Sequence, residues 1–324
     1  MLKVLFTVDT ELQFRSGTGR DTDVAANYSA NVLGETPEGA FGLDYQLRMF
    51  REQAIKGIFF VEALHAHALG NALLASTVGA IQDANQEVQL HLHVEWLRRL
   101  DAPLFGKPAG AYLNDYSPQE QRQLVAMGLK LLREAGAQDV CAFRAGSFAA
   151  DDATLEAVEE NGLRYDSSYN AVHGGRECRI ERGRATALPV RVGQVVEVPV
   201  TVFRTPPFGV RPAAVCACSF AEMRNMLNKA HDAQLPCFVI LCHSFELLTN
   251  NRKRANPIVV RRFENLCRYL GENRDRFQTV GFDGVGDTEL RDASADESRL
   301  VSSPLTTVSR MLQQAAGRYY EWRT

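Results

Sequence analysis

The sequence predicts an α/β protein in which parallel strands are joined by helices. Apolar runs of strand length alternate with longer helical patterns along most of the 324 residues. Chemically active side chains follow the ends of several of these runs, as in parallel α/β folds. The length suits a (β/α) barrel or a doubly wound sheet, and the content of 45% hydrophobic and 23% charged residues is ordinary for a globular domain.

The expected strands are short and mostly apolar, and most of them precede a helical pattern. They cover residues 2–8, 57–61, 87–94, 140–143, 195–202, 237–242 and 279–282. Helices are expected at residues 43–53, from about 62, and at 118–135, 151–161, 219–233 and 258–270. A capping-box sequence at Ser117 opens the third of these helices, and Gly162 ends the fourth.

Two segments interrupt the alternation. Residues 15–42 are rich in Gly, Asn, Thr and Asp and predict a long loop. We expect this loop to form a wall or lid of the substrate cleft, the alternative being an excursion that packs on a neighbouring subunit. Residues 287–304 are polar and lead to a short C-terminal helix. The predicted domains are therefore 1–286, and 287–324 as a linker with a helix.

Charge and cysteine content narrow the classes of protein. The formal net charge of −3 excludes a polybasic nucleic-acid binder. No window reaches the roughly 18 apolar residues of a membrane span, and the first residues lack the apolar core of a signal peptide. Seven cysteines form no zinc-ribbon spacing and are expected to be reduced. These features predict a cytoplasmic protein and leave its oligomeric state open.

A strictly alternating segment, residues 88–96, is the strongest candidate for metal binding. On a strand, His91, His93 and Glu95 would share one face, and the apolar residues between them would share the other. Two imidazoles and a carboxylate on one face suit a divalent metal such as zinc. The alternative is a half-exposed strand whose polar face meets solvent.

Two carboxylates follow the first expected strand. Asp9 and Glu11 share a face if the chain stays extended, at the strand end where active sites of parallel α/β folds gather. Buried carboxylates need a metal, a salt bridge or a proton-transfer role. The alternative is a helix-capping Asp beside a solvated Glu.

Two further candidates lie at the ends of later strands. Arg144 can hold a carboxylate in its planar guanidinium group. His243 directly follows an apolar strand and has the natural chemistry of an acid or base near neutral pH. A lone histidine at such a place is more often structural.

Taken in order, these segments resemble the motifs of the polysaccharide deacetylase (NodB-homology) family, which includes carbohydrate esterase family 4. The family's Thr-Phe-Asp-Asp motif resembles Thr7-Val8-Asp9-Thr10-Glu11, and its His-x-x-x-His resembles His91-Leu92-His93-Val94-Glu95. Its Arg motif, with a small residue and Pro-Tyr, resembles Arg144-Ala145-Gly146-Ser147-Phe148, and its Leu-x-His resembles Leu241-Cys242-His243. The variants are similar to a divergent branch associated with surface-polysaccharide biosynthesis.

The resemblance implies a distorted (β/α) barrel and metal-dependent removal of an acetyl group from a sugar. Asp9 would be the base, oriented by Arg144, and His243 the acid. Thr10 and Glu95 stand where the family has metal ligands, so we expect Glu11 to replace the missing Asp, with His91 and with His93 or Glu95. Zinc is the expected metal.

The expected substrate is an N- or O-acetylated sugar or a nucleotide- or lipid-linked sugar precursor. Two alternatives stay open: a C–N hydrolase of a non-sugar amide on the same fold, and a non-catalytic carbohydrate-binding relative. Among weaker candidates, His65 and His67 are expected on a solvated helix surface. Trp96 and Phe148 are expected either to stack on a sugar or to pack in the core.

Overall fold

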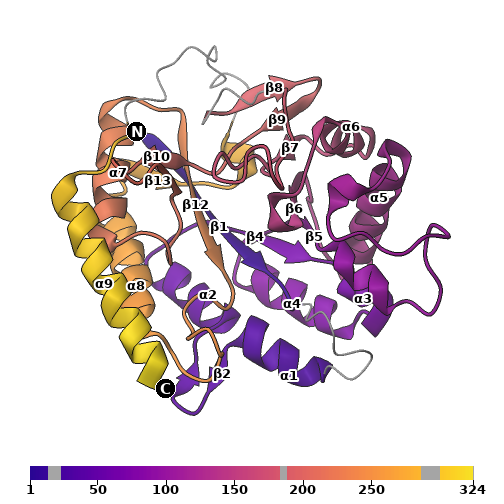
Figure 1. The fold of residues 1–324 in the computed structure, drawn as a ribbon, viewed down its shortest axis with the longest axis horizontal. Coiled ribbons are helices and arrows are strands. Elements are labelled where there is room, and N and C mark those ends of the chain that lie inside the picture. The colour runs from indigo at the N-terminus through magenta and orange to yellow at the C-terminus, as the bar shows by residue number, and fades with distance from the viewer. Residues whose placement is uncertain (14–22, 183–187, 286–299, 324) are drawn as a thin grey trace.

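The computed structural model describes residues 1–13, 23–182, 188–285 and 300–323. Its centre is a strongly curved sheet of nine strands, seen as the arrows in the middle of Figure 1. The strands run in the order β12 (Cys237–His243), β1 (Leu2–Thr10), β4 (Gly57–Glu62), β5 (Glu87–Leu92), β6 (Ala142–Ala145), β7 (Tyr165–Asp166), β9 (Val195–Glu197) and β8 (Val190–Val192), with β13 (Phe277–Thr279) also on β1. All pairs are parallel except β8 with β9.

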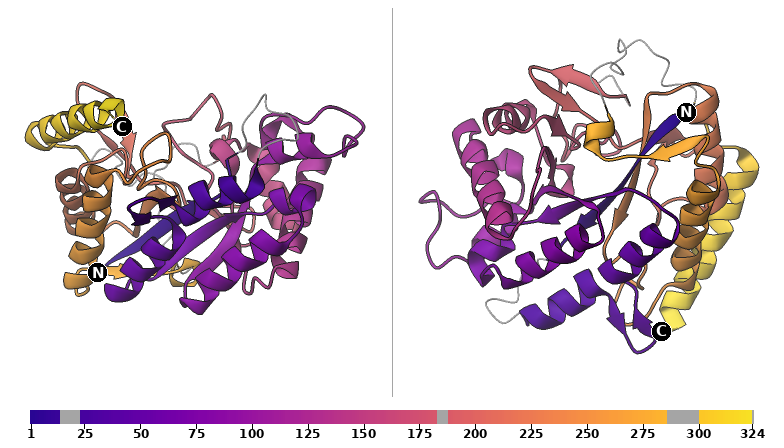
Figure 2. Two further views of the ribbon diagram at one scale, coloured as in Figure 1. Left: turned by 90° about the horizontal axis from the view of Figure 1, so that it is seen from below. Right: turned by 180° about the vertical axis from the view of Figure 1, so that it is seen from behind.

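Helices cover the outer face of this sheet (Figures 1 and 2). Those that follow the strands are α2 (Leu43–Glu52), α3 (His65–Leu69), α4 (Ala72–Asp83), α5 (Pro118–Glu134), α6 (Asp152–Glu160), α7 (Phe220–Asp232) and α8 (Pro257–Glu272). The predicted capping box is present, since Ser117 accepts the backbone N–H of Glu120, and Asp151 caps α6 in the same way by accepting that of Thr154.

Both faces of β1 are buried in apolar clusters. Phe6 and Val8 point outward into the main apolar core beneath the helices. Leu5 points inward, where it packs with Ile58 and Phe60 in a second apolar cluster. A sheet that buries both faces against apolar groups is the arrangement expected for parallel strands. Toward the strand ends, the inner face changes to Thr7 and Asp9, so the polar site lies above an apolar floor.

Irregular chain covers the free edge of β12. The backbone N–H of Leu241 donates to the carbonyl of Ala213 (2.9 Å), and that of Val215 donates to the carbonyl of Leu241 (3.0 Å). This segment follows a small hairpin of β10 (Val202–Arg204) and β11 (Val210–Pro212). The fold is therefore the distorted (β/α) barrel expected from the motif resemblance.

Several predicted boundaries shift. The strand predicted at 87–94 ends at Leu92 and gives way to a 3-10 helix at Val94–Arg99. The strand predicted at 140–143 is β6, two residues later, and residues 195–202 divide between β9 and β10. The helix predicted from 62 begins later, because Glu62 ends β4 and its carboxylate accepts the N–H of Leu64 and of His65.

The prediction of a long loop at 15–42 is wrong for residues 23–42, and residues 15–22 lie outside the described residues. This segment contains α1 (Val24–Tyr28), a π-helix (Ser29–Leu33) and a hairpin of β2 (Glu35–Thr36) and β3 (Gly39–Ala40). Two of its polar side chains are buried: Asn27 bonds to the backbone of Gln13, and Asn31 accepts from Arg252. Tertiary packing thus orders a segment whose composition predicted a loop.

The C-terminal helix α9 (Pro304–Arg323) lies alongside α7 and α8 (Figures 1 and 2). A fully buried ion pair ties it to α7, with Arg310 Nε 3.1 Å from Glu222 Oε1. Most of the predicted linker, residues 287–299, lies outside the described residues. No helix in the described part of the chain is both long and apolar enough to cross a bilayer.

Candidate active site

The predicted site residues meet at the carboxyl ends of neighbouring strands. Asp9 on β1 is in register with His243 on β12, and His91 on β5 is in register with Arg144 on β6. Paired residues of parallel strands point to the same face, so all four side chains lie on the inner side of the barrel. The structure thus brings together residues that are up to 234 positions apart in the chain.

Arg144 and Asp9 form a buried ion pair. Arg144 Nη1 lies 2.5 Å from Asp9 Oδ1, and the Arg144 side chain is wholly buried. The other guanidinium nitrogens donate to the backbone carbonyl and hydroxyl of Ser167, at 3.1 and 3.0 Å. The ring of Phe60 lies below the guanidinium, 4.1 Å from its central carbon. With its donors occupied on three sides, Arg144 holds Asp9 in one position.

Glu11, His91 and His93 form a candidate metal centre. One ligand atom from each of them lies within 4.8 Å of the others. Glu11 Oε2 is 3.2 Å from His91 Nε2 and 2.5 Å from His93 Nε2. One carboxylate oxygen and two imidazole nitrogens converging on a single point form a donor set that suits zinc. Glu11 therefore lies where the sequence predicted a replacement for the missing Asp.

The far nitrogen of each imidazole is held in place. His91 Nδ1 donates to the carbonyl oxygen of Arg144 at 2.8 Å, and His93 Nδ1 donates to Glu95 Oε1 at 2.8 Å. Because these acceptors require a proton on Nδ1, Nε2 is the nitrogen that each imidazole directs toward Glu11 and would offer to a metal. Carbonyl and carboxylate partners of this kind orient histidine ligands in metal sites.

Glu11 and His93 form an ion pair. Burial opposes the charge on Glu11, but the charge of His93 and hydrogen bonds from His93 and His91 hold the pKa of Glu11 well below its usual value. Burial likewise opposes the charge on His93, and Glu11 and Glu95 raise the pKa of His93 well above its usual value. A bound cation would replace the proton on His93 Nε2 as the partner of Glu11.

Of the two alternative ligands that the sequence left open, His93 lies in the cluster with Glu11 and His91, and Glu95 lies outside it. The strand ends at Leu92, so Glu95 lies in the following 3-10 helix. Glu95 contacts Nδ1 of His93, whereas Glu11 contacts Nε2. Gly146 allows this placement of His93: a Cβ at 146 would lie 2.9 Å from the His93 ring and 2.6 Å from the carbonyl oxygen of Leu92.

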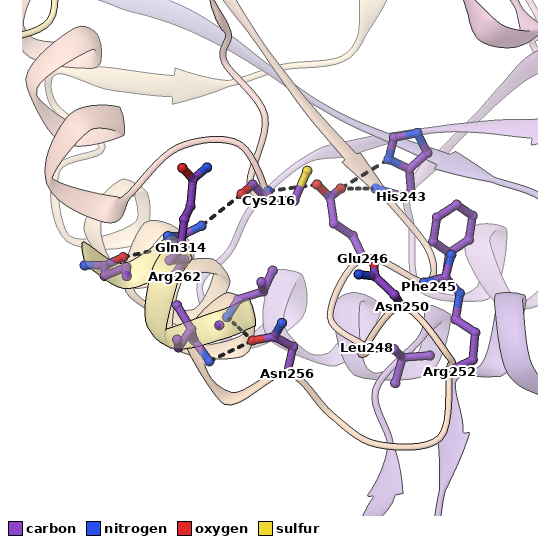
Figure 3. A pocket seen from close by; sticks show the side chains of 14 residues that line it. Cys216, His243, Phe245, Glu246, Leu248, Asn250, Arg252, Asn256, Arg262 and Gln314 are labelled. Carbon is purple, nitrogen blue, oxygen red and sulfur yellow. Dashed lines mark hydrogen bonds and ion pairs between the residues drawn. The ribbon is translucent and has the colours of Figure 1, made fainter. Parts of the chain in front are cut away.

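His243 has a carboxylate partner that sequence reasoning missed. Glu246 Oε2 lies 3.2 Å from His243 Nδ1 and also accepts the backbone N–H of His243 at 2.7 Å, as Figure 3 shows. Burial lowers the pKa of His243, but Glu246, with Asp9 and Glu11 farther away, raises it to about 9. The only sequence signal for this partner was its position three residues after His243.

One weaker prediction is corrected here, and burial decides between two alternatives that the sequence left open. His65 is buried, with only 2% of its surface exposed, and its Nδ1 pairs with Glu62 at 2.8 Å, although His67 is exposed as predicted. Trp96 is 1% exposed and packs in the main core, which excludes it as a stacking platform. Phe148 is 8% exposed and packs mainly in a small apolar cluster.

Comparisons with known proteins define the class of fold. The chain matches no family model and no curated protein sequence. Among solved structures it is similar to a Mycobacterium smegmatis protein provisionally assigned as a polysaccharide deacetylase, at 16% identity and a TM-score of 0.57 over 94% of both chains. It is also similar to a family 4 carbohydrate esterase from Streptomyces lividans in complex with acetate, at 10% identity and a TM-score of 0.42 over 87% of this chain and 93% of that one.

A third similar structure is a mutant family 4 pseudoenzyme with restored activity, at 14% identity and a TM-score of 0.40 over 92% of this chain and 68% of that one. The likeness to the Mycobacterium protein shows a common fold over nearly the whole of both chains. That fold is the distorted barrel that the ordered motifs predicted.

Proposed function

We propose that this protein is a metal-dependent hydrolase that removes an acetyl group from an N- or O-acetylated sugar. The observation that carries the proposal is one arrangement: the Asp9–Arg144 ion pair stands beside the cluster of Glu11, His91 and His93 on the inner side of the barrel. The fold shared with the Mycobacterium protein agrees with this assignment.

Glu11, His91 and His93 would hold the metal, which we propose to be zinc. The donor set fits, because each imidazole presents Nε2 while its Nδ1 is bonded to a fixed acceptor. Three protein ligands leave a position for water or substrate. A bound divalent cation supplies polarisation of the acetyl carbonyl and a lowered pKa of water.

Asp9 would take the proton from the attacking water. Arg144 contacts Oδ1, so Oδ2 is the oxygen proposed to receive that proton. The backbone links the two parts of the site, since the carbonyl of Arg144 orients His91 while its guanidinium orients Asp9. A displacement of Arg144 would therefore disturb both the base and a ligand.

His243 would give a proton to the leaving nitrogen or oxygen. Glu246 engages Nδ1, which leaves Nε2 as the donor, and 28% of the His243 side chain is exposed to reach a substrate. With a pKa of about 9, His243 is protonated at neutral pH, as a general acid must be.

The finer assignments extend this proposal. The substrate would be a nucleotide- or lipid-linked sugar precursor, used in surface-polysaccharide biosynthesis by a cytoplasmic enzyme. We keep residues 1–286 as the catalytic domain and 287–324 as a linker and helix, with α9 packed on that domain.

Acetate release tests the proposed function. Purified zinc-loaded protein is incubated with N- and O-acetylated sugars, their nucleotide-linked forms and simple non-sugar acetamides, and Asp9→Asn serves as the inactive control. We expect acetate from a sugar substrate in the wild type only. Release from the non-sugar amides alone would favour the amide hydrolase, and sugar binding without acetate release would favour the non-catalytic relative.

A further inference from the structure

A pocket of about 390 Å³ begins at His243 and extends toward the C-terminal helix. Figure 3 shows His243 and Glu246 at one end and Arg262 and Gln314 at the other. Its walls come from the segment after β12, from α8 and from α9, including Gln313, Gln314 and Gly317. A substrate placed at His243 could therefore extend into this pocket.

The lining mixes polar and apolar side chains, and its charges are mainly positive. The charged side chains in it are His243, Glu246, Arg252 and Arg262. His243 and Glu246 form an ion pair with each other. Arg252 lies over the ring of Phe245, with its central carbon 4.2 Å from the ring centroid, and that ring stacks on His243.

Arg262 is a buried cation without a carboxylate partner among the described residues. It is 6% exposed, and its bonds are to neutral acceptors: Nε donates to Gln313 Oε1 at 3.0 Å, and Nη1 donates to the carbonyl of Cys216 at 2.9 Å. Nη2 has no hydrogen-bond partner in the described structure. Buried charges are normally paired, and arginine stays protonated in proteins.

Glu222, a carboxylate whose charge acts on Arg262, is already engaged. Glu222 Oε1 accepts from Arg310 Nε at 3.1 Å, and Arg310 also donates to Gln314 at 2.7 Å. Burial lowers the pKa of Arg262, and the like charge of Arg310 acts in the same direction. An anion beside Arg262 would relieve both effects.

We propose that this pocket binds an anionic group of the ligand, a carboxylate or a phosphate, with Arg262 as its buried counter-charge. The proposal deepens the proposed function, on which it rests for the acetyl group placed at His243. The planar guanidinium suits the oxygens of either anion. Gln314, at the same wall, would adjust to admit the group because its side chain is only partly buried.

Direct binding tests the pocket without relying on turnover. Calorimetry on the zinc-loaded protein compares N-acetylglucosamine with N-acetylglucosamine 1-phosphate and with N-acetylmuramic acid. Charged hydrogen bonds contribute about 1.5–3 kcal/mol, so we expect at least one anionic sugar to bind about ten- to a hundredfold more tightly than the neutral one. Which of the two gains identifies phosphate or carboxylate as the group.

Two variants locate the effect. Gln314→Glu adds a negative charge at the pocket while keeping an acceptor for Arg310, so it should fold normally and lose the advantage of the anionic sugar. Arg262→Met should do the same, and Arg261→Met, at the exposed neighbouring position, is the matched control. Equal binding of neutral and anionic sugars by the wild type, or an unchanged advantage in Gln314→Glu, would overturn the proposal.

The outcomes separate this proposal from the proposed function. An anionic preference that Gln314→Glu abolishes, in a protein that releases no acetate, supports the pocket and counts against the hydrolase. Acetate release from neutral and anionic sugars with equal KM supports the hydrolase and overturns the pocket.

Discussion

Two histidines at the site, His93 and His243, each have a carboxylate partner at Nδ1, which is Glu95 for His93 and Glu246 for His243. They differ in the surroundings of Nε2. His93 Nε2 faces Glu11 and the second imidazole of the cluster, and 14% of its side chain is exposed. His243 is twice as exposed, at 28%, and borders the pocket. Nε2 of His93 therefore points to the centre of the candidate metal cluster, whereas Nε2 of His243 can meet a ligand from solution.

The surroundings of each Nε2 indicate which role that histidine has. A carboxylate behind Nδ1 makes an imidazole a better metal ligand when its Nε2 meets other ligands. A carboxylate in the same position keeps an imidazole protonated when its Nε2 faces substrate, because it raises the pKa of that imidazole. We therefore expect changes on the His93 side to alter metal affinity, and changes on the His243 side to alter pH dependence.

The largest expected effect is that of Asp9→Asn, which lies between the two histidines. The amide keeps the shape but cannot take a proton, so turnover should fall about 10²–10⁴-fold, the usual contribution of a general base. Metal content should stay at the wild-type level, because Asp9 is not in the ligand cluster. Asp44→Asn, on an exposed part of α2, is the control. A wild-type rate in Asp9→Asn would assign the base elsewhere.

A middle-sized effect is expected from Glu95→Gln. Removing the charge behind His93 should weaken metal binding about 10–100-fold, as is usual for partners of metal-bound histidines. Competition with a chromogenic chelator measures the affinity, and the exposed Glu134→Gln is the control. Unchanged affinity would show that Glu95 gives no support to the metal site.

The smallest effect at neutral pH is expected from Glu246→Gln. Losing this charge should move the pKa of His243 from about 9 toward its ordinary value of 6.5. Activity requires the protonated form, so its alkaline limb should move to lower pH. NMR titration of the His243 ring measures the pKa directly, and an unchanged pKa would contradict the role of Glu246.

The same shift has a consequence for stability. Because the folded-state pKa of His243 is raised, its contribution to the free energy of unfolding is fully present below about pH 6.5 and is lost as pH rises through about 9. The loss of unfolding free energy between these pH values should therefore be smaller in Glu246→Gln than in the wild type. Urea unfolding at several pH values measures it.

The site could be predicted from sequence where strand periodicity applied. The alternation around His91 and the carboxylates after the first strand marked these residues as candidates. The register and order of the strands bring them together. Glu246 escaped this reasoning because it lies in a turn, where no period marks a shared face. Arg262 escaped it because an arginine on an amphipathic helix is usually solvated, whereas this one is buried against Gln313 of α9 and the carbonyl of Cys216.

The fold was predictable for a related reason. Buried parallel strands are continuous apolar runs, so the sequence shows the succession of strands and helices along the chain. The segment 23–42 was not, because its composition favours turns while tertiary contacts of Asn27 and Asn31 order it. His65 was misplaced for the same reason, since Glu62 caps the helix from inside the barrel.

Metal content is the measurement that tests the account most directly. Elemental analysis of purified wild-type protein should find about one divalent metal ion per chain, zinc by preference. His91→Ala should lose that ion while keeping its fold, and His67→Ala, which changes an exposed histidine outside the cluster, should keep it. Wild-type metal content in His91→Ala, in a folded protein, would contradict the proposed centre of Glu11, His91 and His93.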